Sequence, residues 1–181
     1  MYQKHVEPIM SRISNGGLKY QPLPGDGHCF YRAVSLYLDL DAQTLRNIVA
    51  SNIEHNLSHY VGIIRVMNPH QTPQDYINAI RNGEEWADNL EIAILMEVLN
   101  RPIVIMSPDG SIRNKTDIGQ YSGEPIFVYY NGHNHYDGLT LTNSSEQSGS
   151  SILQSLTQLK ELSQKMKEQD KDLDKRSDFV P

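Results

Sequence analysis

The sequence is poor in cysteine: Cys29 is the only one in 181 residues, so no disulfide can form within the chain. Small secreted domains that depend on disulfides are thereby excluded, and we expect a reducing compartment, the cytoplasm. The sequence also lacks any apolar run near the roughly 18 residues needed to cross a bilayer, and its first residues lack a signal-peptide pattern. We therefore expect a soluble protein with no membrane partner.

Positive charge is also scarce, because 16 Lys and Arg stand against 22 Asp and Glu, which gives a net charge of −6. The pI is about 5.6. The basic residues are scattered until the C-terminal tail, so no basic stripe is available for a nucleic-acid backbone. We expect no nucleic-acid partner, whereas an acidic surface suits a basic protein partner.

The composition, 38% apolar and 21% charged, suffices for one globular domain with an appendage. A stretch rich in Ser, Asn, Gln and Gly predicts a flexible linker near the C-terminus. Beyond it, Ser163 and Asp170 interrupt a heptad-like apolar spacing, which favours one amphipathic helix or a tail, with residues 152–173 available for helix-mediated contact. We predict a leader over 1–17, the domain over 18–142, the linker over 143–151 and the helix or tail over 152–181.

Apolar spacing and capping residues predict four helices in the first half of the chain. The first covers residues 30–38, which puts Cys29 at or near a helix N-terminus. The other helices are one capped by Asp41, one from Thr72 to Gly83 and a deeply packed one within 86–99, while residues 54–71 are ambiguous and residues 1–24 form a leader on the surface.

Strand patterns fill the second half of the chain. Buried-strand patterns occur at 102–106 and 125–130, and a third strand covers 135–141. The turn 107–110 and the loop 131–134 separate them. Helices followed by strands predict an α+β domain with a mostly antiparallel central sheet flanked by helices.

Cys29 has the surroundings of a nucleophile. A thiol attacks as its thiolate, which a nearby base or the N-terminus of a helix favours. The preceding loop, residues 24–28, is punctuated by glycines and can turn its backbone N–H groups toward one point. Such donors can stabilise the oxyanion of a tetrahedral intermediate.

The sequence His135-Tyr136-Asp137 offers the matching base. Alternate side chains on a strand share a face, so His135 and Asp137 project together while Tyr136 points to the opposite layer. We expect Asp137 to accept a hydrogen bond from Nδ1 of His135, which leaves Nε2 to take the thiol proton. Cys29 and His135 are far apart in the sequence, so only folding can bring them together.

Two motifs give the chain a specific resemblance. Residues 26–33, Asp-Gly-His-Cys-Phe-Tyr-Arg-Ala, resemble the cysteine loop of ovarian-tumour (OTU) deubiquitinases, and residues 135–137 resemble their histidine motif. Trp86, Glu91 and the strand at 103–106 are similar in order and spacing to the middle section of these enzymes. The resemblance covers roughly residues 18–142. It implies a papain-like hydrolase fold that cleaves the isopeptide bond at the C-terminus of ubiquitin or a ubiquitin-like modifier.

The same resemblance implies roles for individual residues. Cys29 is the nucleophile, His135 the general base and Asp137 the acid that orients it. The loop from Asp26 helps to form the oxyanion hole, and Asp26 itself counts as a second catalytic candidate. The substrate-contacting loop corresponds to 107–124 and the helical lobe to 38–83, and the substrate-binding candidates are Gly27, His28, Asn134 and Tyr136.

The implied partner is ubiquitin or polyubiquitin, and no cofactor is required. If the protein is an effector, the compartment is a host cytosol. We also expect a narrow groove at Cys29, because a di-glycine tail admits only small side chains around it.

Other interpretations of these residues remain open. His28 adjoins the nucleophile and could serve as the base, although it more readily shapes the loop. His133, His135 and Cys29 could bind zinc, but no fourth ligand presents itself, so we expect no metal. Trp86 is expected in the core and Glu91 on a helix face with a hydrogen bond, and one of the tyrosines at 129, 130 and 136 borders the substrate tail.

Two other functions compete with the deubiquitinase. One is a catalytically weak module that keeps the OTU fold to bind ubiquitin, which the intact Cys29, His135 and Asp137 argue against. The other is a papain-like protease that acts on ordinary peptides.

Overall fold

The computed structural model describes residues 17–114 and 120–141 of the chain. Their elements are β1 (Leu18–Gln21), α2 (Cys29–Ser35), α3 (Ala42–His55), α4 (Leu57–Met67), α5 (Pro73–Asn82), α6 (Asn89–Leu99), β2 (Ile103–Met106), β3 (Ile126–Tyr130) and β4 (Tyr136–Leu141). The linker and the C-terminal helix or tail expected from residue 143 onward lie outside the described residues, as does nearly all of the leader.

The described strands form one sheet in the order β1-β4-β3-β2. The pairs β1–β4 and β3–β4 are antiparallel, whereas β2 and β3 are parallel. The prediction of a mostly antiparallel sheet in an α+β domain is therefore confirmed. The parallel pair requires a long connection back to the same end of the sheet, and residues 107–125 supply it.

Strand β1 was not expected, because the sequence analysis assigned this stretch to a leader on the surface. It has only four residues and lies at the edge of the sheet, where it pairs with β4 from Leu18–Leu141 to Gln21–Gly138. Turn residues flank it closely on both sides, so too few positions remain for a clear two-residue alternation. Its pairing partner lies more than a hundred residues away in the sequence.

Helices α3 and α5 begin where their predicted caps, Asp41 and Thr72, placed them. The Asp41 side chain accepts from the backbone N–H of Thr44 at 2.7 Å, and Gly83, whose φ of 80° suits glycine, caps the C-terminal end of α5 as predicted. The first helix is shorter than expected, since α2 begins at Cys29 and ends at Ser35. The ambiguous segment 54–71 contains α4.

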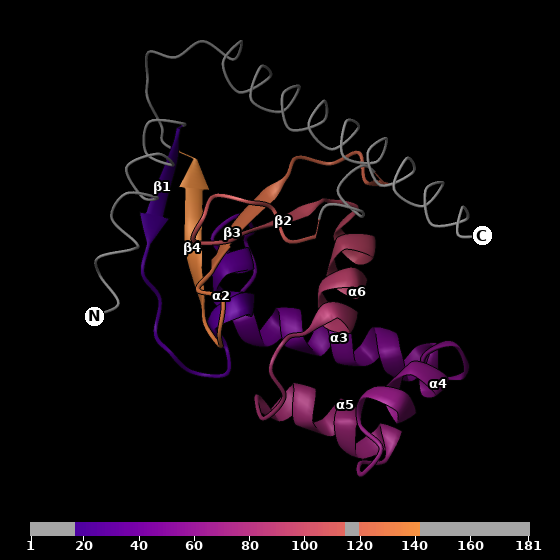
Figure 1. Ribbon diagram of the computed structural model, residues 1–181. Helices are drawn as coiled ribbons and strands as arrows, with labels where there is room; N and C mark the ends of the chain where they lie inside the picture. The colour runs from indigo at the N-terminus through magenta and orange to yellow at the C-terminus, as the bar shows by residue number, and fades with distance from the viewer. Residues whose placement is uncertain (1–16, 115–119, 142–181) are drawn as a thin grey trace, which may run out of the picture.

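The main core lies between the helices and one face of the sheet, and α2 packs directly on β4 and β3 (Figure 1). Phe30 and Val34 from α2 join Leu45 from α3, Leu95 from α6 and Val128 from β3 in this cluster, each at most 1% exposed. This packing brings the first turn of α2 to the start of β4. None of the helices within 17–114 and 120–141 is long and apolar enough to span a membrane.

Candidate active site

Cys29 is the first residue of α2, and its side chain lies beside the start of β4. The residue is 6% exposed, and the backbone N–H groups of Tyr136 and Phe30 lie beside its sulfur. Burial raises the pKa of the thiol, while those two N–H groups act in the opposite direction. The fold therefore unites the two motifs that are far apart in the sequence, because α2 packs on β4 and places Cys29 beside Tyr136, the residue after His135.

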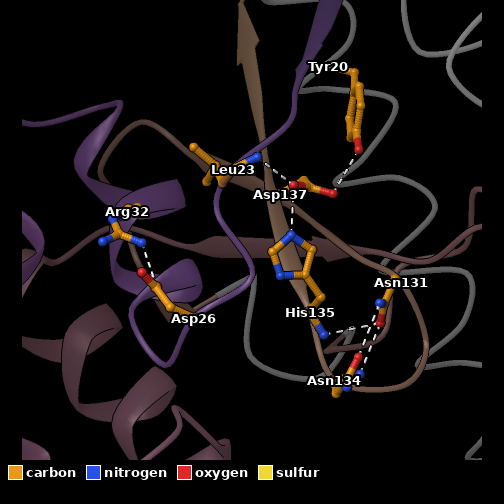
Figure 2. Close-up of polar contacts among 8 residues, drawn as sticks. All are labelled: Tyr20, Leu23, Asp26, Arg32, Asn131, Asn134, His135 and Asp137. Carbon is orange, nitrogen blue, oxygen red and sulfur yellow. Dashed lines mark hydrogen bonds and ion pairs between the residues drawn. The ribbon is translucent and has the colours of Figure 1, made fainter. Parts of the chain in front are cut away.

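His135 immediately precedes β4, and its ring faces Asp137 (Figure 2). The Nε2 atom of His135 lies 2.9 Å from Oδ1 of Asp137. The expected sharing of one face is thus confirmed, but the expected contact through Nδ1 is wrong. Alternation along a strand fixes the side on which a ring lies, whereas rotation about χ2 decides which nitrogen meets the carboxylate.

The other ring nitrogen of His135 faces the loop that precedes Cys29. A Cβ atom added at Gly25 would lie 3.9 Å from Nδ1 of His135. Within the described residues no hydrogen bond joins this ring to the sulfur of Cys29. Nδ1 is accordingly the nitrogen that remains on the side of the cysteine loop.

Asp137 is held by a set of donors that the sequence did not reveal. Its Oδ1 accepts from the backbone N–H of Leu23 at 2.7 Å, and its Oδ2 accepts from the Tyr20 hydroxyl at 2.8 Å (Figure 2). The residue is only 5% exposed. An ionised carboxylate only accepts hydrogen bonds, so Nε2 of His135 is the donor in its pair with Asp137.

The backbone before His135 is shaped by Asn131. The Asn131 Oδ1 accepts from the N–H groups of His133 at 2.8 Å, Asn134 at 3.0 Å and His135 at 3.1 Å. Gly132 within this turn has a φ of 89°. The Asn-Gly pair was the signal for such a turn, because an asparagine side chain caps nearby amides and glycine accepts positive φ.

Asp26, the second candidate acid, has different partners. Its Oδ1 accepts from Nη1 of Arg32 at 2.5 Å and from the backbone N–H of His28 at 3.0 Å, apart from the His135 pair (Figure 2). The bond from Arg32 holds the pKa of Asp26 below its usual value. Among the described residues, Asp26 makes no hydrogen bond with His135 or Asp137, so the acid that contacts the histidine is Asp137.

The amides of the cysteine loop do not all point outward. Asp26 N–H donates to the Pro24 carbonyl at 3.0 Å, and Cys29 N–H donates to the Asp26 carbonyl at 3.2 Å. With the bond from His28 N–H to the Asp26 side chain, three amides of the loop are engaged within it. The expected convergence on one point is therefore limited, among the described residues of the loop, to the amides of Gly25 and Gly27.

A cleft of about 270 Å³ opens beside Cys29. Its lining residues are Gly27, Cys29, Phe30, Glu85, Trp86, Ala87, Asp88, Tyr130, His133, Asn134 and Tyr136. Three substrate-binding candidates from the sequence, Gly27, Asn134 and Tyr136, are among them. His28 is not among them. The segment 85–88 was missed because nothing in the sequence links a loop before a helix to a cysteine 56 to 59 positions earlier.

Trp86 was expected in the core, and this was wrong, because the residue is 52% exposed on the wall of the cleft. It lies outside α6, whose N-cap is Asp88. Of the three tyrosines considered, Tyr129 is buried on the other face of the sheet, while Tyr130 and Tyr136 line the cleft. A large apolar side chain alone does not distinguish a core position from a binding surface.

Known proteins resemble this chain in sequence and in fold. Residues 24–139 match the model of a family described as OTU-like cysteine protease. The chain belongs to this family. Among relatives, it is 27% identical over 168 residues to the deubiquitinase OTUD6B of Gallus gallus, covering 81% of this chain and 54% of that protein. It is 24% identical over 140 residues to the ubiquitin thioesterase otu2 of Schizosaccharomyces pombe, covering 70% and 47%.

A plant relative is the OTU domain-containing deubiquitinating enzyme 6 of Arabidopsis thaliana, 30% identical over 128 residues, with 68% of this chain and 24% of that protein covered. This OTU-like chain thus spans about half the length of OTUD6B and otu2, and less of the plant enzyme. Its fold is like that of the OTUD1 OTU domain, with a TM-score of 0.61 at 21% identity over 77% of this chain and 96% of that one. An OTU domain in complex with ubiquitin gives a TM-score of 0.57 at 22% identity, with 78% and 84% covered.

Glu91 in α6 has a structural role away from the His135 pair. Glu91 is fully buried, as its expected hydrogen bond implied: its Oε2 accepts from the Asp88 N–H at 2.8 Å, and its Oε1 accepts from the Tyr76 hydroxyl. For zinc, the described ranges contain no group of three His, Cys, Asp or Glu residues placed to hold a metal ion.

Proposed function

We propose that this chain is a deubiquitinase, which hydrolyses the isopeptide bond at the C-terminus of ubiquitin. The observation that carries the proposal is that Cys29 shares one cleft with Tyr136, the residue between His135 and its hydrogen-bond partner Asp137. Relatives named as deubiquitinases or a ubiquitin thioesterase support the reaction. A similar fold has been solved in complex with ubiquitin, which supports the partner.

In the proposed reaction, His135 donates its Nε2–H to Asp137, so Nδ1 is left as the base. Nδ1 removes the thiol proton as the sulfur of Cys29 attacks the carbonyl of the terminal glycine. The tetrahedral intermediate collapses to a thioester, and His135 gives that proton to the departing lysine amine. Water, deprotonated by His135, then hydrolyses the thioester and restores the thiol. These steps require no cofactor.

Burial of Cys29 decides how the thiolate forms. Because burial raises the pKa of the thiol, the resting free protein holds a neutral thiol rather than a stored thiolate. Deprotonation must then accompany substrate binding, with His135 as general base. Gly27 is the loop amide that we propose as an oxyanion donor, because its neighbours donate within the loop.

The acidic groups have separate roles in this proposal. Asp137 orients His135, while Asp26, paired with Arg32, holds the shape of the loop before Cys29. Asn134 and Tyr136 border the cleft that receives the modifier tail. The thiol must stay reduced to act, so we also propose the cytoplasm as the location.

The test is labelling by a ubiquitin that carries an electrophile at its C-terminus. Wild type should form a covalent adduct, and Cys29→Ala should not. His135→Ala should label at least about a hundredfold more slowly, whereas His59→Ala, an exposed histidine on α4, is the matched control and should keep the wild-type rate. Digestion of a panel of differently linked di-ubiquitins then gives the linkage preference.

The same experiment separates the competing functions. Ubiquitin binding without any labelling of the wild type would establish a binding module instead of an enzyme. Cleavage of unstructured peptides with no effect on folded ubiquitin would establish an ordinary peptidase. Either result overturns the proposal.

A further inference from the structure

Arg46 on α3 is completely buried, although no sequence pattern indicated a role for it. A buried guanidinium is costly unless its N–H groups are satisfied. Within the described residues it has no carboxylate partner at salt-bridge distance. Its charge is instead met by carbonyl dipoles and by the face of Tyr31, whose ring centroid lies 4.4 Å from the guanidinium carbon.

One side of the guanidinium holds the cysteine loop. Its Nε donates to Nδ1 of His28 at 3.1 Å, and its Nη2 donates to the carbonyl of Gly27. These two residues directly precede Cys29. The Nδ1 of His28 is therefore the acceptor nitrogen, and the neutral ring carries its proton on Nε2.

The other side of the guanidinium holds the opposite wall of the cleft. Its Nη1 donates to the Ile80 carbonyl in α5 and to the Glu85 carbonyl after it, both at 2.9 Å. Glu85 begins the segment that lines the cleft together with Trp86. One planar fork thus joins two segments between which Cys29 is reached, a geometry that the single ammonium of a lysine cannot reproduce.

The two segments are also in close contact without Arg46. A Cβ atom added at Gly27 would lie 2.8 Å from the Gly83 carbonyl oxygen, and one added at Gly83 would lie 2.7 Å from the ring of His28. No side chain fits between them. A small displacement of either segment would therefore move the loop that carries Cys29.

We propose that Arg46 is a positioning residue for Cys29. It holds Gly27 and His28 of the cysteine loop against Ile80 and Glu85 of the opposite cleft wall. The kinetic part of this inference rests on the proposed function. The hydrogen bonds by which Arg46 holds the two segments do not depend on that function, and they can be tested in the free protein.

The first test compares Arg46→Lys with Arg65→Lys, a matched change at an exposed arginine on α4. Lysine keeps the positive charge but loses the fork, so kcat on a fluorogenic ubiquitin substrate should fall roughly tenfold or more while KM changes by less than about threefold. Arg65→Lys should match the wild type. A folded Arg46→Lys variant with the wild-type kcat would overturn the positioning role.

The second test needs no activity, and its first measurement needs no variant. In the wild type, NMR should detect a scalar coupling across the hydrogen bond between Nε of Arg46 and Nδ1 of His28. Burial, followed by the charge of Arg46, lowers the pKa of His28, with Arg32 acting in the same direction and Asp26 against it. His28 should therefore titrate below its usual range, and in Arg46→Gln its midpoint should rise.

Absence of the coupling, together with a His28 that titrates at its ordinary value in the wild type, would overturn the inference even if both variants failed to fold.

The outcomes also separate this inference from the proposed function. If the wild type does not act on ubiquitin but the coupling is present, the proposed function fails while Arg46 still holds the loop. The rate of Cys29 alkylation in folded Arg46→Lys then replaces kcat as the measure of position, and an unchanged rate would count against the inference.

Discussion

The imidazole of His135 meets Asp137 through Nε2, at 2.9 Å from Oδ1, and turns Nδ1 toward the loop that carries Cys29. The carboxylate is simultaneously engaged by Tyr20 and by the amide of Leu23, so three donors converge on one buried acid. Such a carboxylate can hold the ring in one tautomer and stabilise the imidazolium that forms when the thiol loses its proton. Of the two candidate acids, Asp137 is therefore the one that orients His135, because Asp26 pairs with Arg32 instead.

Replacing each acid by its amide should separate their roles. Asp137→Asn puts an N–H donor among donors and disturbs the tautomer of His135, so kcat/KM on a fluorogenic ubiquitin substrate should fall at least about a hundredfold. Asp26→Asn removes a partly exposed pair with Arg32 and should cost less than about tenfold. A larger loss from Asp26→Asn than from Asp137→Asn would assign the catalytic acid to Asp26.

Tyr20→Phe should weaken the reaction without touching any reacting atom. The hydroxyl on Oδ2 of Asp137 is lost, and hydrogen bonds to charged groups contribute about 1.5 to 3 kcal/mol, so kcat should fall roughly tenfold. Tyr60→Phe is the control, because its hydroxyl donates to Asn52 Oδ1 at 3.2 Å in a contact unrelated to the cleft. Equal effects of the two changes on kcat would show that Tyr20 acts only through general stability.

The free thiol should react slowly at neutral pH. Burial raises the pKa of Cys29 above its ordinary value, so the thiolate fraction increases only as the pH passes that raised value. The rate constant for alkylation by iodoacetamide should still be rising above pH 9. Cys29 is the only cysteine, so mass spectrometry of the intact chain reports it alone. A rate that is already maximal at pH 6 would instead indicate a stored thiolate.

Local rules predicted those parts of the structure that depend on neighbouring residues. Asp41 and Thr72 cap α3 and α5 because a cap needs only an acceptor a few positions from the amide that it binds. The placing of His135 and Asp137 on one face followed from strand alternation in the same way. The two motifs also gave the family, which the match over 24–139 confirms.

The remaining parts depend on contacts between distant segments. Strand β1 exists because β4 pairs with it, and Tyr20 reaches Asp137 across that pairing. Arg46 lies in a helix that an arginine could occupy equally well with its side chain in solvent, and only the folded chain brings Gly27 and Glu85 to it. The side-chain torsion χ2 decides which nitrogen of His135 faces the acid, and the spacing of residues in a sequence does not encode that torsion.

The exposed position of Trp86 predicts a binding effect with little loss of stability. Trp86→Ala removes no core packing, so the free energy of unfolding should change by less than about 1 kcal/mol, whereas a buried tryptophan would cost about 3 to 5 kcal/mol. KM for the ubiquitin substrate should rise, because the cleft wall is lost. Trp86 is the only tryptophan, so its fluorescence in Cys29→Ala should also change when ubiquitin binds. A large loss of stability would show that Trp86 contributes to the core.

Glu91 should give the domain a stability that falls as the pH rises. Burial raises the pKa of Glu91 from 4.5 to about 7, against the bonds that it accepts from backbone amides. The folded state therefore keeps the proton between these values while the unfolded state releases it, so stability decreases with pH from about 4.5 to 7 and is constant above. From pH 5 to pH 8, the unfolding free energy of wild type minus that of Glu91→Gln should decrease by about 2 to 3 kcal/mol. Urea denaturation at both pH values measures this difference. Glu97→Gln, on the exposed face of α6, is the control for removing a charge. A difference that grows with pH would show that Glu91 is ionised in the folded state.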